Sequence, residues 1–146
     1  MIKDNHGVKG VLNLPFLENS GTYKGKSIFQ INCVNAWGNS FRIFRDGKSI
    51  GYIQMHVFRN LAQINLVEEG PYIFSTKGLF GIDWAVRKGL ESVDKDGQKI
   101  HFHQMDEELQ ETLMVCGLYL AEKIRRDFLF FVPAILILWT VFFLLV

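Results

Sequence analysis

The chain has 146 residues, of which 49% are hydrophobic and 21% charged, and its formal net charge is +1 at pH 7. This balance argues against a nucleic-acid binder, because such domains carry a clear basic excess. The two cysteines, Cys33 and Cys116, lie far apart in the sequence. In a reducing cytoplasmic domain we expect both as buried apolar side chains, and not as a disulfide or a metal pair.

Residues 1–21 are predicted to form an extended N-terminal arm that packs on the domain or on a partner, because polar residues and glycines are frequent in them. The first ten residues, MIKDNHGVKG, contain no apolar stretch of the kind that a secretory signal needs. Insertion into a membrane would therefore depend on a later segment.

From about Thr22 to Gln104 the hydrophobic residues alternate with polar ones, as in half-buried strands. In SIFQINCV, Phe29, Ile31 and Cys33 share one face, and Gln30 lies on the other. The run AQINLVE repeats this alternation, with one face formed by Ala62, Ile64 and Leu66.

Glycine-containing pairs separate these runs and predict turns. They are Asp46-Gly47 and Asp96-Gly97, each expected to close a hairpin, and Gly38-Asn39 and Gly70-Pro71. We count about eight short strands with brief connections, which predicts a mainly-β domain of the meander or barrel type.

A helix is predicted over about 106–126, where Asp106 can cap the first turn and acidic residues precede basic ones. Its middle, LMVCGLYLA, is apolar on nearly all sides, so we expect protein to surround it. The residues predicted to fill the domain interior are Leu113, Met114, Cys116, Leu118 and Leu120.

Residues 128–146, FLFFVPAILILWTVFFLLV, contain no charged side chain. As a helix this run would be about 28 Å long, which is close to the thickness of a bilayer's hydrocarbon core. It predicts one transmembrane helix, in which Trp139 would face a protein neighbour. The residues expected to hold the chain in the membrane are Phe128, Phe131, Pro133, Trp139, Phe142 and Val146.

Three cations, Lys123, Arg125 and Arg126, immediately precede this span. By the positive-inside rule they would stay in the cytoplasm, so the N-terminal domain is predicted on the cytoplasmic side of a single-pass protein. In a bacterium the membrane would be the inner one. With no residue after Val146, the pattern is that of a tail anchor.

The order of these parts resembles the tubby-like, LURP-one-related and phospholipid-scramblase-like proteins. FRIFRDGKSIGYI is similar to their hairpins, FGIDW to a late barrel strand, and EELQETLMVCGLYLAEKIRRDFLFF to their central helix. The resemblance covers roughly Thr22–Asp127 and implies an antiparallel barrel around a hydrophobic helix. The barrel would lie on the membrane, joined to the span by a linker of a few residues around Arg126. Without a cysteine-rich palmitoylation stretch, scramblase activity is not implied.

Residues that could carry chemistry are few. GTYKGKS, residues 21–27, is one position short of a phosphate-binding loop and precedes a strand pattern, which favours a polar turn. His101 and His103 share one face of a predicted strand and could bind a metal, but exposure on an outer face explains them equally well. Asp83 is expected at the surface. We therefore expect no enzymatic activity and no cofactor.

The favoured function is that of a non-enzymatic accessory or scaffold subunit, whose partners are membrane lipids and other integral membrane proteins. The alternative is a lipid-binding or lipid-responsive module, which would need basic side chains to converge near the span. The candidates are Lys24, Lys26, Arg42, Arg45, Lys48, Arg59, Arg87 and Lys88.

Overall fold

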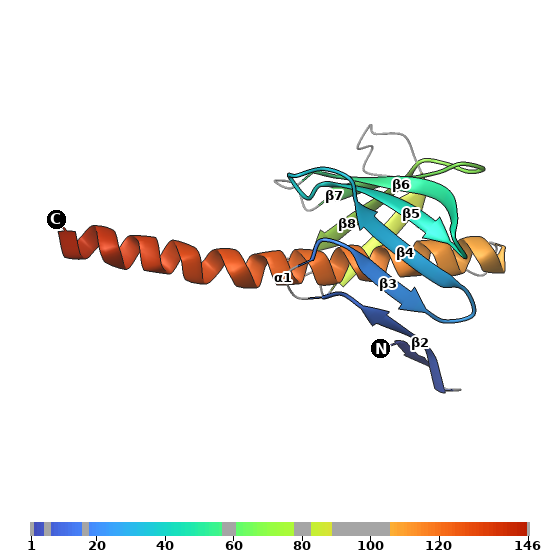
Figure 1. The fold of residues 1–146 in the computed structure, drawn as a ribbon, viewed down its shortest axis with the longest axis horizontal. Coiled ribbons are helices and arrows are strands. Elements are labelled where there is room, and N and C mark those ends of the chain that lie inside the picture. The colour runs from blue at the N-terminus through green and yellow to red at the C-terminus, as the bar shows by residue number, and fades with distance from the viewer. Residues whose placement is uncertain are drawn as a thin grey trace.

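A computed structural model describes residues 2–4, 7–15, 18–56, 61–77, 83–88 and 106–145 of the chain (Figure 1). These residues form antiparallel strands followed by one helix. The elements are β1 (Ile2–Asp4), β2 (Gly7–Asn13), β3 (Gly21–Lys24), β4 (Ile28–Cys33), β5 (Ser40–Arg45), β6 (Lys48–His56), β7 (Leu61–Leu66), β8 (Tyr72–Lys77), β9 (Asp83–Lys88) and α1 (Glu107–Leu145).

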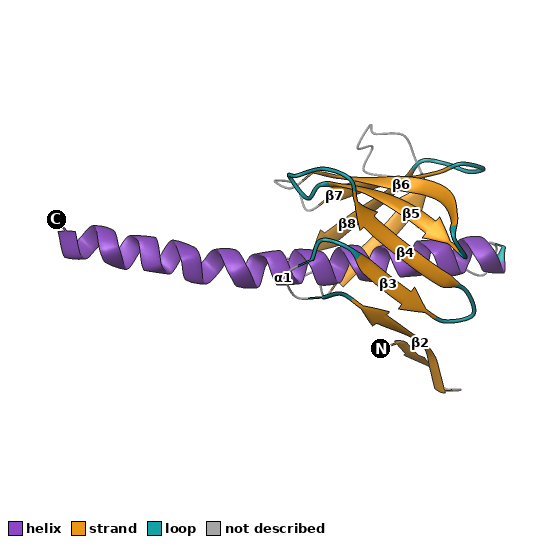
Figure 2. Cartoon of the chain, in the orientation of Figure 1, coloured by secondary structure: helices purple, strands orange, loops and turns teal. Residues whose placement is uncertain are grey.

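Each strand pairs with the next one along the chain, so the sheet is a meander with the order β1 to β9. The sheet curls around the first half of α1 as a half-barrel, and the second half of α1 extends away from it (Figure 2). The prediction of a mainly-β antiparallel domain with a C-terminal hydrophobic helix is confirmed. The predicted turn at Asp96-Gly97 and the strand with His101 and His103 lie outside the described residues.

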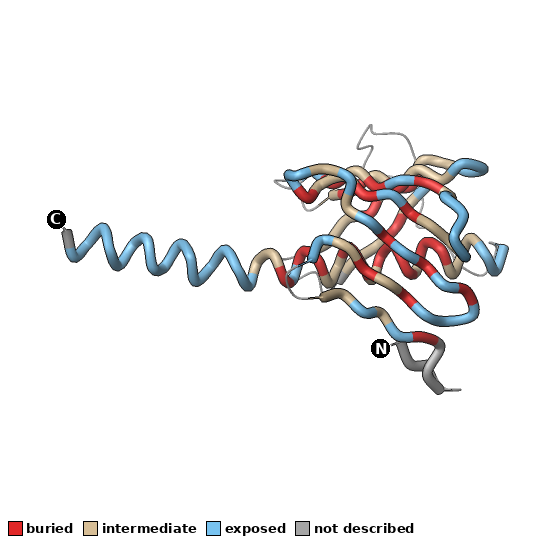
Figure 3. The backbone as a smooth tube through the Cα atoms, in the orientation of Figure 1, coloured by how far each residue is buried: buried red, intermediate tan, exposed pale blue. Residues whose placement is uncertain are grey.

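The alternation read from the sequence sets the two faces of the sheet. Phe29 and Ile31 are fully buried on the concave face, whereas Gln30 is exposed, and Ala62 and Ile64 repeat the buried positions. Figure 3 shows this alternation of buried and exposed positions along the strands. The apolar side chains of the concave face meet α1, which is where the core lies.

The Asp46-Gly47 pair closes a two-residue hairpin between β5 and β6, as predicted. Arg45 pairs with Lys48 across the turn, and φ is positive at both central residues, 48° at Asp46 and 80° at Gly47. Positive φ at both positions defines the hairpin turn that matches strand twist. The Asp46 carboxylate also accepts a hydrogen bond from the Ile28 N–H at 2.9 Å, which ties the turn to β4.

Residues 1–21, predicted as an extended arm that packs on the domain or on a partner, supply two strands of the sheet, β1 and β2. β2 pairs with β3, with Leu12 opposite Tyr23. A Cβ at Gly10 would lie 2.3 Å from the Tyr23 ring, so this glycine allows the ring to lie against β2. The glycines that suggested an arm are therefore compatible with a strand that pairs with β1 on one side and β3 on the other.

The predicted linker near Arg126 is wrong, whereas the prediction that the apolar run continues the core helix outward is confirmed, since α1 is one continuous helix of 39 residues. Residues 118–132 contain neither glycine nor proline, so nothing in this stretch interrupts helical hydrogen bonding. Asp106 starts the helix as predicted, its carboxylate accepting a hydrogen bond from the Glu108 N–H at 3.3 Å.

Three of the five residues predicted to fill the interior, Leu113, Cys116 and Leu120, are fully buried. Burying a leucine side chain contributes about 1.5–3 kcal/mol, so this face of α1 stabilises the domain. Met114 and Leu118 are only half-buried among the described residues. The described strands curl around α1 only part of the way, so the expectation that protein surrounds it on all sides stays a prediction.

At Gly117, α1 packs closely against Trp84 of β9. A Cβ built on Gly117 would lie 2.3 Å from the ring of Trp84. Glycine inside a helix costs about 1 kcal/mol relative to alanine. Glycine is needed at this position because any larger side chain would overlap the Trp84 ring.

Gly117→Ala is expected to destabilise the protein by about 1–3 kcal/mol, because overpacking outweighs the gain in helix propensity. Thermal unfolding of the full chain in mild detergent, followed by circular dichroism, measures this change. Trp84→Phe removes the part of the indole that meets the new methyl group, so it should restore part of the loss in the double variant. A higher melting temperature for Gly117→Ala would contradict the contact.

Candidate membrane anchor and its junction with the domain

The second half of α1 is an exposed apolar rod. The described part of the chain contains one helix that is long and apolar enough to cross a membrane, and none of its most apolar stretch is buried. Leu138, Trp139 and Phe143 are 65–69% exposed, and Leu144 is 85% exposed. In water this surface would be strongly unfavourable, so it needs an apolar environment.

The polar groups of this rod are suited to such an environment. The Thr140 hydroxyl lies 2.9 Å from the carbonyl oxygens of both Leu136 and Ile137, so it is satisfied within the helix. Pro133 lies inside α1 and has no N–H to donate to the Leu129 carbonyl. Transmembrane helices tolerate such a proline where neighbouring groups re-satisfy the carbonyl.

All but one of the predicted anchor residues lie on this rod. Phe131, Trp139 and Phe142 are each 65% exposed, Pro133 is exposed, and Phe128 is half-buried at its base. Val146 lies outside the described residues. The Trp139 and Phe143 rings pack with centroids 5.4 Å apart, so the two side chains together form one aromatic surface.

At the base of the rod, the three predicted topology-setting cations have different environments. Lys123 is 3% exposed, and its ammonium donates to the Asp127 carboxylate at 2.7 Å and to Asn19 Oδ1 at 3.1 Å. Arg126 is buried and donates to the Pro15 carbonyl at 2.5 Å. Only Arg125 is exposed.

Arg125 forms an ion pair with Glu122 on the same helix, with 2.6 Å between Nη2 and Oε1. All three cations of the pre-membrane segment therefore have partners within the protein. Two of them, Lys123 and Arg126, connect the helix to the segment between β2 and β3.

We call this set the junction: Pro15, Asn19, Tyr119, Lys123, Arg126 and Asp127. The Tyr119 hydroxyl donates to the Asn19 carbonyl at 2.5 Å, and burial raises the pKa of Tyr119 well above its usual range. The hydroxyl therefore stays protonated as a donor. The junction holds the β2–β3 segment against α1 at the level where the helix leaves the domain.

Sequence reasoning identified the cations of the junction but not their partners. Asn19 and Pro15 lie in the predicted arm, more than one hundred residues before Lys123 and Arg126. No periodicity links residues that far apart, so only the folded structure brings them together.

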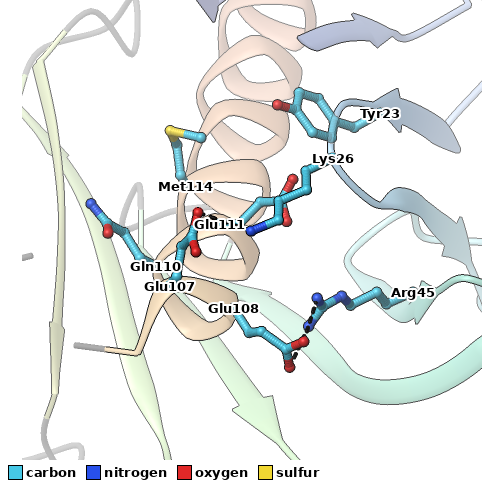
Figure 4. A pocket seen from close by; sticks show the side chains of 8 residues that line it. All are labelled: Tyr23, Lys26, Arg45, Glu107, Glu108, Gln110, Glu111 and Met114. Carbon is cyan, nitrogen blue, oxygen red and sulfur yellow. Dashed lines mark hydrogen bonds and ion pairs between the residues drawn. The ribbon is translucent and has the colours of Figure 1, made fainter. Parts of the chain in front are cut away.

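At the other end of the domain, α1 begins among charged side chains (Figure 4). Arg45 forms two contacts of 2.9 Å with the Glu108 carboxylate, and Lys26 lies 3.0 Å from Glu107. These residues line an open pocket of about 370 Å³ together with Glu111 and Met114. Both ion pairs join a cation of the strand region, Lys26 or Arg45, to a carboxylate in the first turn of α1. They therefore hold the start of α1 against the sheet.

The remaining chemical candidates are absent or inert within the described part of the chain. No group of three His, Cys, Asp or Glu side chains could hold a metal there. Both cysteines are free, Cys33 is half-buried, and burial raises the pKa of Cys116 to about 12, so its thiol is a poor nucleophile. The GTYKGKS segment forms β3 and a polar turn into β4, as favoured.

Comparison with known proteins gives no match to a family model, a curated protein or a solved structure. The resemblance to the tubby-like, LURP-one-related and scramblase-like proteins therefore stays a prediction.

Lys123→Met is expected to destabilise the protein by about 1–3 kcal/mol, because it leaves the Asp127 carboxylate and the Asn19 side chain without their donor. Arg125→Met is the matched control, since an exposed ion pair contributes at most about 1 kcal/mol. Thermal unfolding in mild detergent compares the two variants. Equal melting temperatures for both would show that the junction does not stabilise the domain.

Proposed function

We propose that this protein is a single-pass, membrane-anchored accessory or scaffold subunit without enzymatic activity of its own. The observation that carries the proposal is the continuity of α1. The same helix forms the domain core at Leu113 and Leu120 and the exposed apolar rod beyond Phe128. A domain attached in this way has a fixed position relative to the span, as a scaffold needs.

The orientation belongs to the same proposal. Lys123, Arg125 and Arg126 precede the span within two helical turns, and positive residues next to a span remain in the cytoplasm. The domain would then face the cytoplasm, with the rod crossing the membrane once.

The distribution of the other cations favours a subunit over a lipid-responsive module. Lys26 and Arg45 lie at the start of α1, the end of the domain away from the rod, where they pair with Glu107 and Glu108. A headgroup reader would need basic side chains beside the span. The aromatic surface of the rod instead offers contact area to neighbouring helices, whose packing drives association in a bilayer.

The anchor is tested by placing two lysines in the middle of the rod, as Ile137→Lys with Leu138→Lys. Each lysine costs about 2.5–3.5 kcal/mol at the centre of a membrane helix, so the pair should prevent insertion. The double variant is expected in the soluble or carbonate-extracted fraction, and the unmodified chain in the membrane pellet. Val67→Lys, at an exposed position of the domain, is the control and should stay in the pellet. Membrane retention of the double variant would contradict the proposed anchor.

The subunit function is tested by affinity purification of the full chain in mild detergent. We expect it to co-purify with at least one integral membrane protein in a stoichiometric amount. Replacing residues 128–145 by a leucine-alanine helix of equal length keeps an apolar span but removes its aromatic side chains, so recovery of the partner should fall. A chain that purifies alone contradicts the subunit function, and one that retains anionic lipid without protein favours the lipid-responsive alternative.

A further inference from the structure

The meander places alternate connections at opposite ends of the domain. The β4–β5 connection lies at the end from which α1 emerges (Figure 1). There a Cβ on Gly38 would lie 2.9 Å from the Asn19 side chain, which in turn accepts a hydrogen bond from Lys123. Through Asn19, the connection therefore lies beside the junction and close to the last buried turns of the helix.

The sequence of this connection, VNAWGN, carries no charged residue, and its apolar side chains are exposed. Trp37 is 87% exposed and Val34 is 57% exposed. None of the large apolar side chains that the structure describes is more exposed than Trp37. The opposite end of the domain presents the charged residues Lys26, Arg45 and Glu107 around the start of α1. The uncharged connection therefore differs from the charged turns at the opposite end of the domain.

The turn that carries Trp37 is held by its own hydrogen bonds. The Asn35 carbonyl accepts from the Gly38 N–H at 3.2 Å, and the Asn35 side chain accepts from the N–H groups of Asn39 and Ser40, also at 3.2 Å. Gly38 adopts the left-handed conformation, with φ of 65°, that completes the turn. Trp37 is thus presented at the tip of an ordered turn.

We propose that this turn, residues 34–39, is a second membrane contact in which Trp37 enters the headgroup region beside the span. The inference rests on the proposed anchor. Tryptophan is enriched at the membrane–water interface, where its apolar ring and its polar N–H are both accommodated. Because α1 is rigidly joined to the sheet at the junction, a contact to one side of the helix restricts how far the domain can tilt on the membrane.

The test is depth-dependent quenching of tryptophan emission in the full chain, reconstituted in phosphatidylcholine vesicles whose acyl chains carry bromine near the headgroup or deep in the bilayer. The chain contains Trp37, Trp84 and Trp139. Comparing Trp139→Phe with the Trp37→Phe, Trp139→Phe double variant isolates Trp37. We expect shallow bromines to remove more of the Trp37 emission than deep ones.

The matched control places a tryptophan at the opposite end of the domain, as Val67→Trp in the double-variant background. Val67 is 79% exposed in the turn after β7, so its tryptophan should be accessible to solvent and untouched by brominated lipid. Trp37 is also exposed, so its replacement by Phe should leave the fold intact, which circular dichroism checks.

Three other outcomes overturn the inference, and they are distinguishable. If Trp139 is quenched by deep bromines while Trp37 is not, the anchor stands and the turn faces a protein partner or solvent. If Val67→Trp is quenched as strongly as Trp37, the quenching does not report on this end of the domain. If Trp139 escapes quenching as well, the proposed anchor fails together with the second contact.

Discussion

Packing of the first half of α1 against the concave face of the sheet is the interaction on which the rest of the molecule depends. Leu113, Cys116 and Tyr119 are fully buried there, and the edge of Trp84 lies against the helix at Gly117. Because the helix continues without a break, these contacts also fix the direction in which the exposed apolar rod leaves the domain. Core packing and the direction of the apolar rod are therefore properties of one helix.

The junction lies where α1 passes from the core of the domain to the exposed apolar rod. A buried ammonium group is tolerated only when it is paired and hydrogen-bonded, and Lys123 has both Asp127 and Asn19 as partners. Its charge also lies 5.8 Å from the centre of the Phe41 ring, a favourable cation–π position. Two of the three cations predicted to set topology, Lys123 and Arg126, thus contribute to the fold as well, and Arg125 is the exposed one of the three.

The side chains that surround the start of α1 differ from those of the turn beside its exit. Ion pairs surround its start, where Glu107 and Glu108 are also favourably placed relative to the helix dipole. An uncharged turn lies beside its exit. The uncharged turn and the paired cations of the junction therefore lie together at the end of the half-barrel from which the apolar rod extends.

Much of this architecture was determined by local sequence. Alternation placed Phe29 and Ile31 in the core, Asp46-Gly47 specified a hairpin, and the uncharged run from Phe128 onward specified an apolar helix, because each feature depends only on neighbouring residues. The tertiary structure alone decided that the N-terminal segment joins the sheet and that Asn19 is a partner of Lys123. These features depend on contacts between residues far apart in the chain, which neither periodicity nor composition encodes.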